Sequence, residues 1–229
     1  HSDSSLVTMF DNGFETSSST PTRVVHLDGA NGLATANETA QCSSLRPRKI
    51  WPSCVPAQIG WNTHQLELMS GHHQLSRVSS ASHVLVAVIR SEMTMLPHFL
   101  AHYRALGIEA FIVADNLSTD GSREYLLSQT DVLLYSVDSE YKASHFGVAW
   151  QQAMLGNHCI GKWVVLADAD EFLVFPDWQK RGLASLTQEL DADGFDCVGT
   201  WLVDMYPKGD RDKCDFKKES PFDVARWHD

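Results

Sequence analysis

The chain has 229 residues, enough for one large or two small domains, and its 43% hydrophobic content allows an ordinary buried core. Its formal net charge is −11, and most of this charge lies in residues 81–229, where 13 Lys and Arg face 23 Asp and Glu. An acidic surface repels a phosphate backbone, so the composition argues against a protein that binds nucleic acid.

Residues 1–80 differ in composition from the rest of the chain. They are rich in Ser, Thr, Asn and Gly, and their short apolar pieces show no helical period. We expect them to form a β-rich or irregular N-terminal segment of unknown role, joined by a linker over residues 70–82 to a second unit at 81–229.

Apolar strands alternate with helices from residue 83 onward. A helix is predicted to begin at Leu96-Pro97, because proline is tolerated in a first turn, and to end at Gly107. The predicted strands cover residues 83–89, 108–114, 132–137 and 164–167, and further helices are predicted to begin near residues 123 and 144. This alternation predicts an α/β fold with a mainly parallel sheet and helices on both faces.

Polar residues follow the second of these strands. Asp115 stands at its carboxyl end, and the next residues, Asn116 to Ser122, are mostly turn formers. Asp120 or Ser122 is expected to cap the following helix. Asp115 is expected at the edge of the sheet where ligands bind in open α/β folds.

Three acids interrupt an apolar run further along the chain. Asp168, Asp170 and Glu171 follow Val164 to Ala167, and the apolar run resumes at Phe172. Carboxylates beside a buried strand are costly unless a cation or hydrogen bonds satisfy them. Oxygen ligands suit Mg²⁺ or Mn²⁺, which commonly bind substrate phosphates as well. This motif predicts a metal-dependent site for a phosphorylated ligand.

His98 and His102 are four residues apart on the predicted helix, a spacing that can bind zinc. No third ligand is evident in the sequence, so exposed surface histidines are the simpler interpretation. Cys159 and Cys197 lie in apolar surroundings and are predicted to be free core thiols.

Several motifs together resemble a known enzyme family. They are Arg90-Ser91-Glu92 with Leu96-Pro97, Gly107 to Ser122, Phe146 to Gln151, and Gly161 to Phe172. In their order and spacing, residues 84–206 resemble a nucleotide-sugar glycosyltransferase of GT-A fold. The nearest group is the bacterial "glycosyl transferase family 2"-like group, related to glycosyltransferase family 92. Ser91 departs from the asparagine that this family usually carries there.

The resemblance implies a metal-dependent transfer of a sugar, with inversion, from a UDP-sugar to a hydroxyl acceptor. Asp168 and Asp170 would hold Mn²⁺ or Mg²⁺ on the diphosphate, and Asp115 would contact the nucleoside. The positions expected to bind the sugar nucleotide are Arg90, Glu92, Asp115, Asn116, Asp120 and Asp168.

Inverting enzymes of this kind also need a base that deprotonates the acceptor hydroxyl. Asp204 and Asp229 are the carboxylates expected to serve, since both lie downstream of Asp170. The family normally continues beyond the position where this chain stops. Residues 81–229 are therefore expected to be a C-terminally truncated GT-A domain.

Two other functions fit parts of the pattern. An apolar strand ending in Asp-x-Asp also occurs in Mg²⁺-dependent phosphatases of the haloacid dehalogenase type, where the first Asp is the nucleophile. In those enzymes the motif opens the domain, whereas here three strand–helix units precede it. The second alternative is a degenerate GT-A fold that binds a sugar nucleotide or a protein without catalysis.

No run of about twenty apolar residues is present, so no transmembrane segment or signal peptide is expected. Cys42 and Cys54 would form a disulfide only in an oxidising compartment. The simplest prediction is a bacterial enzyme of the cytoplasm, with peripheral membrane attachment left open.

Overall fold

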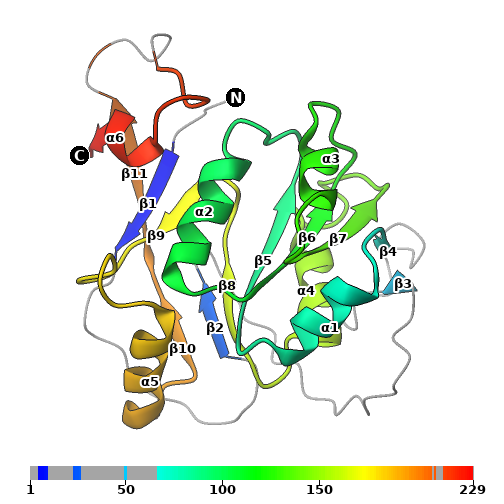
Figure 1. Cartoon of the computed structure of the whole chain (residues 1–229), viewed down its shortest axis with the longest axis horizontal. Helices are drawn as coiled ribbons and strands as arrows, with labels where there is room; N and C mark the ends of the chain where they lie inside the picture. The colour runs from blue at the N-terminus through cyan, green and yellow to red at the C-terminus, as the bar shows by residue number, and fades with distance from the viewer. Residues whose placement is uncertain are drawn as a thin grey trace.

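The computed structural model describes residues 66–207, Gly209 and residues 214–228. It also describes the backbone of three short strands nearer the N-terminus. These are β1 (Ser5–Met9), β2 (Arg23–His26) and β3 (Lys49–Ile50). Within these residues the fold is α/β, with a larger, mainly parallel sheet and a smaller sheet beside it (Figure 1).

The larger sheet has the strand order β10-β2-β8-β5-β6-β7-β4-β3. Its other strands are β4 (Leu66–Leu68), β5 (His83–Ile89), β6 (Ala110–Asp115), β7 (Val132–Val137), β8 (Trp163–Leu166) and β10 (Cys197–Gly199). Neighbours from β10 to β7 pair in parallel, whereas β4 and β3 pair antiparallel at one edge. The predicted α/β class and mainly parallel sheet are therefore confirmed.

Helices cover both faces of this sheet. They are α1 (His72–Ser80), α2 (Leu96–Leu106), α3 (Ser122–Leu127), α4 (Val148–His158) and α5 (Leu183–Asp193), whereas the short α6 (Pro221–Val224) lies against β12 of the smaller sheet. Side chains of α2, α3 and α5 pack on one face, and those of α1 and α4 pack on the other. None of the helices in the described part of the chain has the length and apolar character needed to cross a membrane.

Most elements agree with the sequence prediction, but some do not. The strands predicted at 83–89 and 132–137 are confirmed. The helix predicted from residue 96 also forms, and it ends at Gly107, whose φ of 99° is left-handed. The predicted linker at 70–82 is wrong, because α1 forms there and buries Val78 completely against the sheet.

The two predicted core thiols have different surroundings. Cys159 is fully buried, as predicted, whereas Cys197 is exposed because β10 lies at the edge of the larger sheet. Cys42 and Cys54 lie outside the described residues.

The smaller sheet has the order β12-β11-β1-β9. Its strands from the C-terminal half are β9 (Glu171–Leu173), β11 (Trp201–Pro207) and β12 (Ala225–Trp227). β1 pairs with β9 and β11 here, and β2 pairs with β8 and β10 in the larger sheet. The described strands of residues 1–80 therefore belong to the same sheets as residues 81–229.

An aromatic cluster joins the smaller sheet to α2. The ring of His102 lies 5.0–5.4 Å from those of Tyr103, Phe172, Trp178 and Phe222. His102 Nε2 lies 2.8 Å from the carbonyl oxygen of Leu173, and it must donate because a carbonyl only accepts. The expectation of a surface histidine is therefore wrong for His102, which is buried and attaches β9 to α2.

The position of His102 predicts a pH-dependent stability. Burial lowers the pKa of His102 from 6.5 to about 4, although its hydrogen bond to Leu173 acts in the opposite direction. Because the unfolded chain takes up this proton below pH 6.5, His102 destabilises the fold progressively as the pH falls from 6.5 towards 4. The expected loss is about 3 kcal/mol, at about 1.4 kcal/mol for each pKa unit.

Urea unfolding of the wild type and of His102→Gln at several pH values would measure this effect. The glutamine can still donate to Leu173 but has no proton to gain. The stability difference between the two proteins should therefore shrink between pH 7 and pH 4. A constant difference over that range would contradict the assignment.

Candidate functional site

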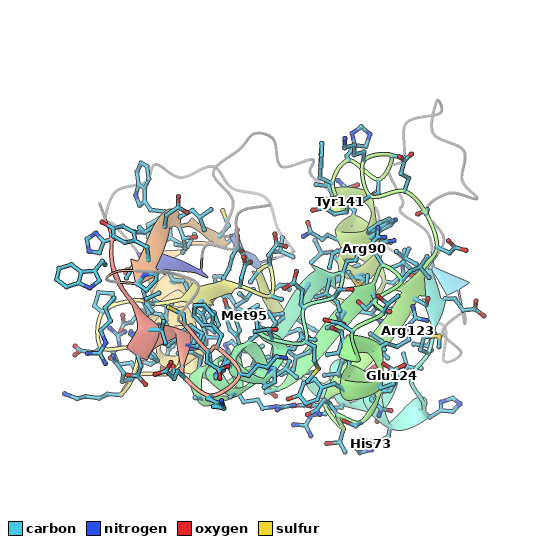
Figure 2. All side chains as sticks on the ribbon, turned by 90° about the horizontal axis from the view of Figure 1, so that it is seen from above. His73, Arg90, Met95, Arg123, Glu124 and Tyr141 are labelled. Atoms are coloured by element: carbon cyan, nitrogen blue, oxygen red, sulfur yellow. The ribbon has the colours of Figure 1, made fainter. Side chains whose placement is uncertain are left out.

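The chain reverses direction across the larger sheet between β5 and β8. From β5 it proceeds to β6 and β7 on one side, and it then returns through α4 to β8 on the other side of β5. In open α/β sheets, ligands bind outside the carboxyl ends of the strands at such a switch point. Figure 2 shows this edge from above, with Arg90, Arg123 and Tyr141 labelled. The topology alone therefore indicates where a ligand would bind.

The acidic motif follows β8 at this edge. Asp168 is exposed and Asp170 is half-buried, and the two residues lie in a tight turn between β8 and β9. The Glu171 N–H donates to the Asp168 carbonyl at 3.0 Å, and Glu171 Oε2 accepts from the Asp168 N–H at 3.0 Å. Glu171, which is 9% exposed, therefore closes the turn, while Asp168 and Asp170 face more solvent.

The register of the strands aligns this turn with β5 and β6. Val86 pairs with Leu166 across β5 and β8, and the Ala167 N–H continues the pairing with a 3.4 Å bond to the Val86 carbonyl. Continuing the register of β5 and β8 by two more pairs brings Asp168 level with Val88. Asp115 at the end of β6 is paired with Ile89. The structure therefore brings Asp115 and Asp168 to the same edge, on either side of β5, as the sequence predicted.

Asp115 is completely buried. Its Oδ2 accepts from Arg123 Nε at 2.5 Å, and its Oδ1 accepts from the Ser118 N–H at 3.0 Å. Arg123 in turn donates to the Ser136 hydroxyl of β7 at 3.3 Å. Asp115 thus fixes the loop that follows β6 to α3 and β7.

Asn116 and Asp120 also make internal hydrogen bonds. The buried Asn116 amide donates to the carbonyl oxygens of Val137 and Ser139, at 3.2 and 3.0 Å. Asp120 accepts from the Met93 N–H and from both the N–H and the hydroxyl of Ser122. Asp120 therefore supports the start of α3, in line with the predicted cap, although the N-cap position itself is Gly121.

The two remaining predicted ligand positions follow β5. Arg90 is exposed, whereas Glu92 is half-buried. The Glu92 N–H donates to the Ser122 hydroxyl at 2.9 Å, so the loop after β5 is bonded to the loop after β6. Ser91, the residue that departs from the family pattern, adds to this junction because its N–H donates to the Ser118 hydroxyl at 2.8 Å.

Left-handed backbone is concentrated at this edge. Among the described residues, five other than glycine have positive φ: Ser91, Leu117, His145, Phe146 and Asp177. The first four belong to the loops that follow β5, β6 and β7. Such residues cost roughly 1–3 kcal/mol each and tend to cluster where a site is held in a fixed geometry. The strained backbone therefore indicates the same edge of the sheet for the ligand site as the topology does.

Asp204 and Asp229, the two carboxylates predicted to act as a base, are placed differently. Asp204 is exposed on β11, and β1 lies between β11 and β9. Leu6 of β1 pairs with both Asp204 and Glu171, so these two backbones are two strand spacings, roughly 10 Å, apart. The smaller sheet thus brings Asp204 towards the acidic turn. Asp229 lies outside the described residues.

Few protein side chains at this site could bind a metal ion. Within residues 66–207 and 214–228, no group of three or more His, Cys, Asp or Glu side chains is arranged to hold a metal ion. The two histidines at a zinc-type spacing make other bonds, since His98 Nε2 bonds the Phe216 carbonyl and His102 Nε2 bonds that of Leu173. The pair Asp168 and Asp170 remains as the predicted ligand set.

Comparison of the chain with protein-family models, with curated proteins and with solved structures found no match. The interpretation of the site therefore depends on its own geometry. Sequence reasoning did not identify Arg123 as the partner of Asp115, or Glu171 as the residue that closes the acidic turn. The available signal for Arg123 was its place at the start of the helix that follows Asp115.

The burial of Asp115 predicts a structural cost for its removal. Asp115→Ala would leave the Arg123 guanidinium without its buried counter-charge, and breaking a buried ion pair in this way costs about 3–5 kcal/mol. Urea unfolding should record this loss. Asp138→Ala, which removes an exposed carboxylate after β7, is the matched control and should change the stability by less than about 0.5 kcal/mol. Equal stabilities of the two variants would contradict the assigned role of Asp115.

Proposed function

We propose that this protein is a metal-dependent glycosyltransferase of GT-A type, which transfers a sugar from a UDP-sugar to a hydroxyl acceptor. The observation that carries the proposal is the acidic turn at the switch point of the sheet. Two carboxylates, Asp168 and Asp170, follow β8 at the place where an open α/β sheet binds its ligand. The order of the surrounding motifs, described above, narrows the ligand to a sugar nucleotide.

The ligand set fits Mg²⁺ or Mn²⁺. These ions commonly use one or two protein carboxylates and complete their coordination with substrate phosphates and water. Asp168 and Asp170 supply that number of carboxylates, and Glu171 is engaged in closing the turn. When bound, the ion would stabilise the negative charge that develops on the diphosphate as the sugar leaves. Asp168 and Asp170 would hold the diphosphate at the end of β8.

The other residues predicted to bind the sugar nucleotide would contribute to the donor site in different ways. Asp115, being fully buried, acts on the nucleoside through the loop that it fixes, whereas Arg90 is exposed at the end of β5 and can approach an anionic ligand directly. Asn116, Asp120 and Glu92 bond neighbouring loops to each other. Because these bonds are internal, the site is organised before any ligand binds.

Inversion requires a base on the acceptor side of the donor sugar. Asp204 is the proposed base among the described residues, because it is exposed and lies across β1 from the acidic turn. A general base typically contributes a rate factor of about 10² to 10⁴. Its role is to take the proton of the acceptor hydroxyl, and it should contribute little to donor binding.

The metal assignment predicts a specific binding defect. Asp170→Asn keeps the size of the side chain but removes a charge that the cation would neutralise. Calorimetry with UDP and Mn²⁺ should show at least about 10-fold weaker binding, since a charge-assisted contact is worth about 1.5–3 kcal/mol. Asp193→Asn, an equal change of charge at the exposed end of α5, is the control and should bind like the wild type.

The same titration tests the alternatives. Equal Mn²⁺-dependent affinity for UDP in the wild type and in Asp170→Asn would contradict the metal assignment. Release of phosphate from simple phosphomonoesters, without binding of UDP, would favour a phosphatase with Asp168 as the nucleophile. Binding of UDP-sugars with neither hydrolysis nor transfer would favour a non-catalytic binding module.

A further inference from the structure

The loop between β7 and α4, residues 138–147, presents aromatic side chains to solvent. Phe146 is 63% exposed and Tyr141 is 41% exposed. Their rings are 5.8 Å apart and almost perpendicular, and Tyr141 also lies 6.1 Å from the ring of the buried Trp150. We call Tyr141 and Phe146 the aromatic corner.

Internal hydrogen bonds hold this corner in one geometry. The buried Ser144 hydroxyl donates to the Tyr141 carbonyl at 2.6 Å and accepts from the Gly147 N–H at 2.9 Å. The Phe146 N–H donates to the same Tyr141 carbonyl at 3.0 Å. The exposed rings are therefore attached to a well-bonded turn.

The geometry of the corner costs free energy. Three consecutive residues, His145, Phe146 and Gly147, have φ of 54°, 58° and 87°, and a bulky aromatic residue is disfavoured in this region. The buried atoms Ser139 Oγ and Trp150 Nε1 in the same loop and helix have no hydrogen-bond partner. Exposed rings, strain and unpaired polar atoms do not stabilise the fold, which indicates that the corner is maintained for a ligand.

The corner lies beside the acidic turn. A Cβ atom placed on Gly147 would be 3.2 Å from Tyr141 and 3.4 Å from the Val88 methyl groups, so Gly147 and Tyr141 both pack at the end of β5. Val88 is level with Asp168 in the extended register of β5 and β8, about one strand spacing of 4.8 Å away. Val88 also faces α4, because it packs in the same core as Trp150. Both features thus occupy the same edge of the sheet.

We propose that the aromatic corner stacks on the nucleobase of the donor, with Phe146 as the main contact. This inference rests on the proposed function, because it takes the diphosphate to be held by Asp168 and Asp170. One nucleoside diphosphate then extends from the acidic turn to the corner. A flat base suits an exposed ring, and stacking on an aromatic side chain tolerates any base because every base has a π face.

Phe146→Asn tests the contact without harming the fold. Asparagine accepts left-handed backbone better than phenylalanine, so the melting temperature should stay within about 4 °C of the wild type. With Mn²⁺ present, its affinity for UDP should fall about 10- to 100-fold, the range expected for one stacked base. Its affinity for pyrophosphate, which has no base, should not change.

Two further proteins sharpen the comparison. Phe146→Trp keeps a stacking ring and should bind UDP like the wild type. Leu127→Asn removes another exposed apolar side chain, 42% exposed, from the far end of α3 and should bind both ligands normally.

The outcomes separate this inference from the proposed function. If the wild type binds neither UDP nor pyrophosphate with Mn²⁺, both proposals fail. If the wild type binds UDP and Phe146→Asn binds it equally well, stacking is refuted and the glycosyltransferase proposal stands. Equal weakening of UDP and pyrophosphate would also refute stacking, because the substitution would then act through the shape of the loop. If Phe146→Asn binds UDP like the wild type but binds a UDP-sugar more weakly, stacking on the base is refuted and the corner contacts the sugar instead.

Discussion

The hydroxyl group of Tyr103 holds the structure together where the two sheets meet. It donates to the carbonyl of Glu171 at 3.2 Å and accepts from the N–H of Leu173 at 3.1 Å. Tyr103 of α2 therefore makes the backbone bonds to β9 that a neighbouring strand would otherwise make. Burial raises the pKa of Tyr103, which keeps this hydroxyl protonated. Tyr103 thereby fixes the β9 end of the turn between β8 and β9, while the bond from the Ala167 N–H to the Val86 carbonyl holds its β8 end, so Asp168 and Asp170 stay at the edge of the larger sheet.

Much of the larger sheet could be predicted from the sequence, since its central strands are continuous apolar runs. β5 and β7 agree with their predicted bounds, because both are buried on both faces. Helices were harder to predict than these strands. The helix α1 lies where the sequence predicts a linker, because most of its residues are polar and Val78 is its only fully buried residue, and α4 begins at residue 148 because the preceding turn adopts left-handed backbone.

The location of the candidate site could be predicted from the sequence, but the structural roles of its residues could not. Carboxyl ends of parallel strands meet at one edge, which is why Asp115 and Asp168 could be placed near each other from sequence. The burial of Asp115 against Arg123, and the exposure of Phe146, depend on how separate loops pack. Such contacts between separate loops leave no pattern in the sequence, so a residue that is predicted to bind a ligand can instead have a structural role.

The most direct measurement of the central claim is the position of a bound metal ion. Crystals of the protein grown with Mn²⁺ and UDP, measured at the manganese absorption edge, would locate the ion by its anomalous signal. The account predicts one strong peak between the diphosphate and the carboxylates of Asp168 and Asp170, beyond the end of β8. A manganese peak elsewhere, or UDP bound away from this edge with no ion at the acidic turn, would contradict it.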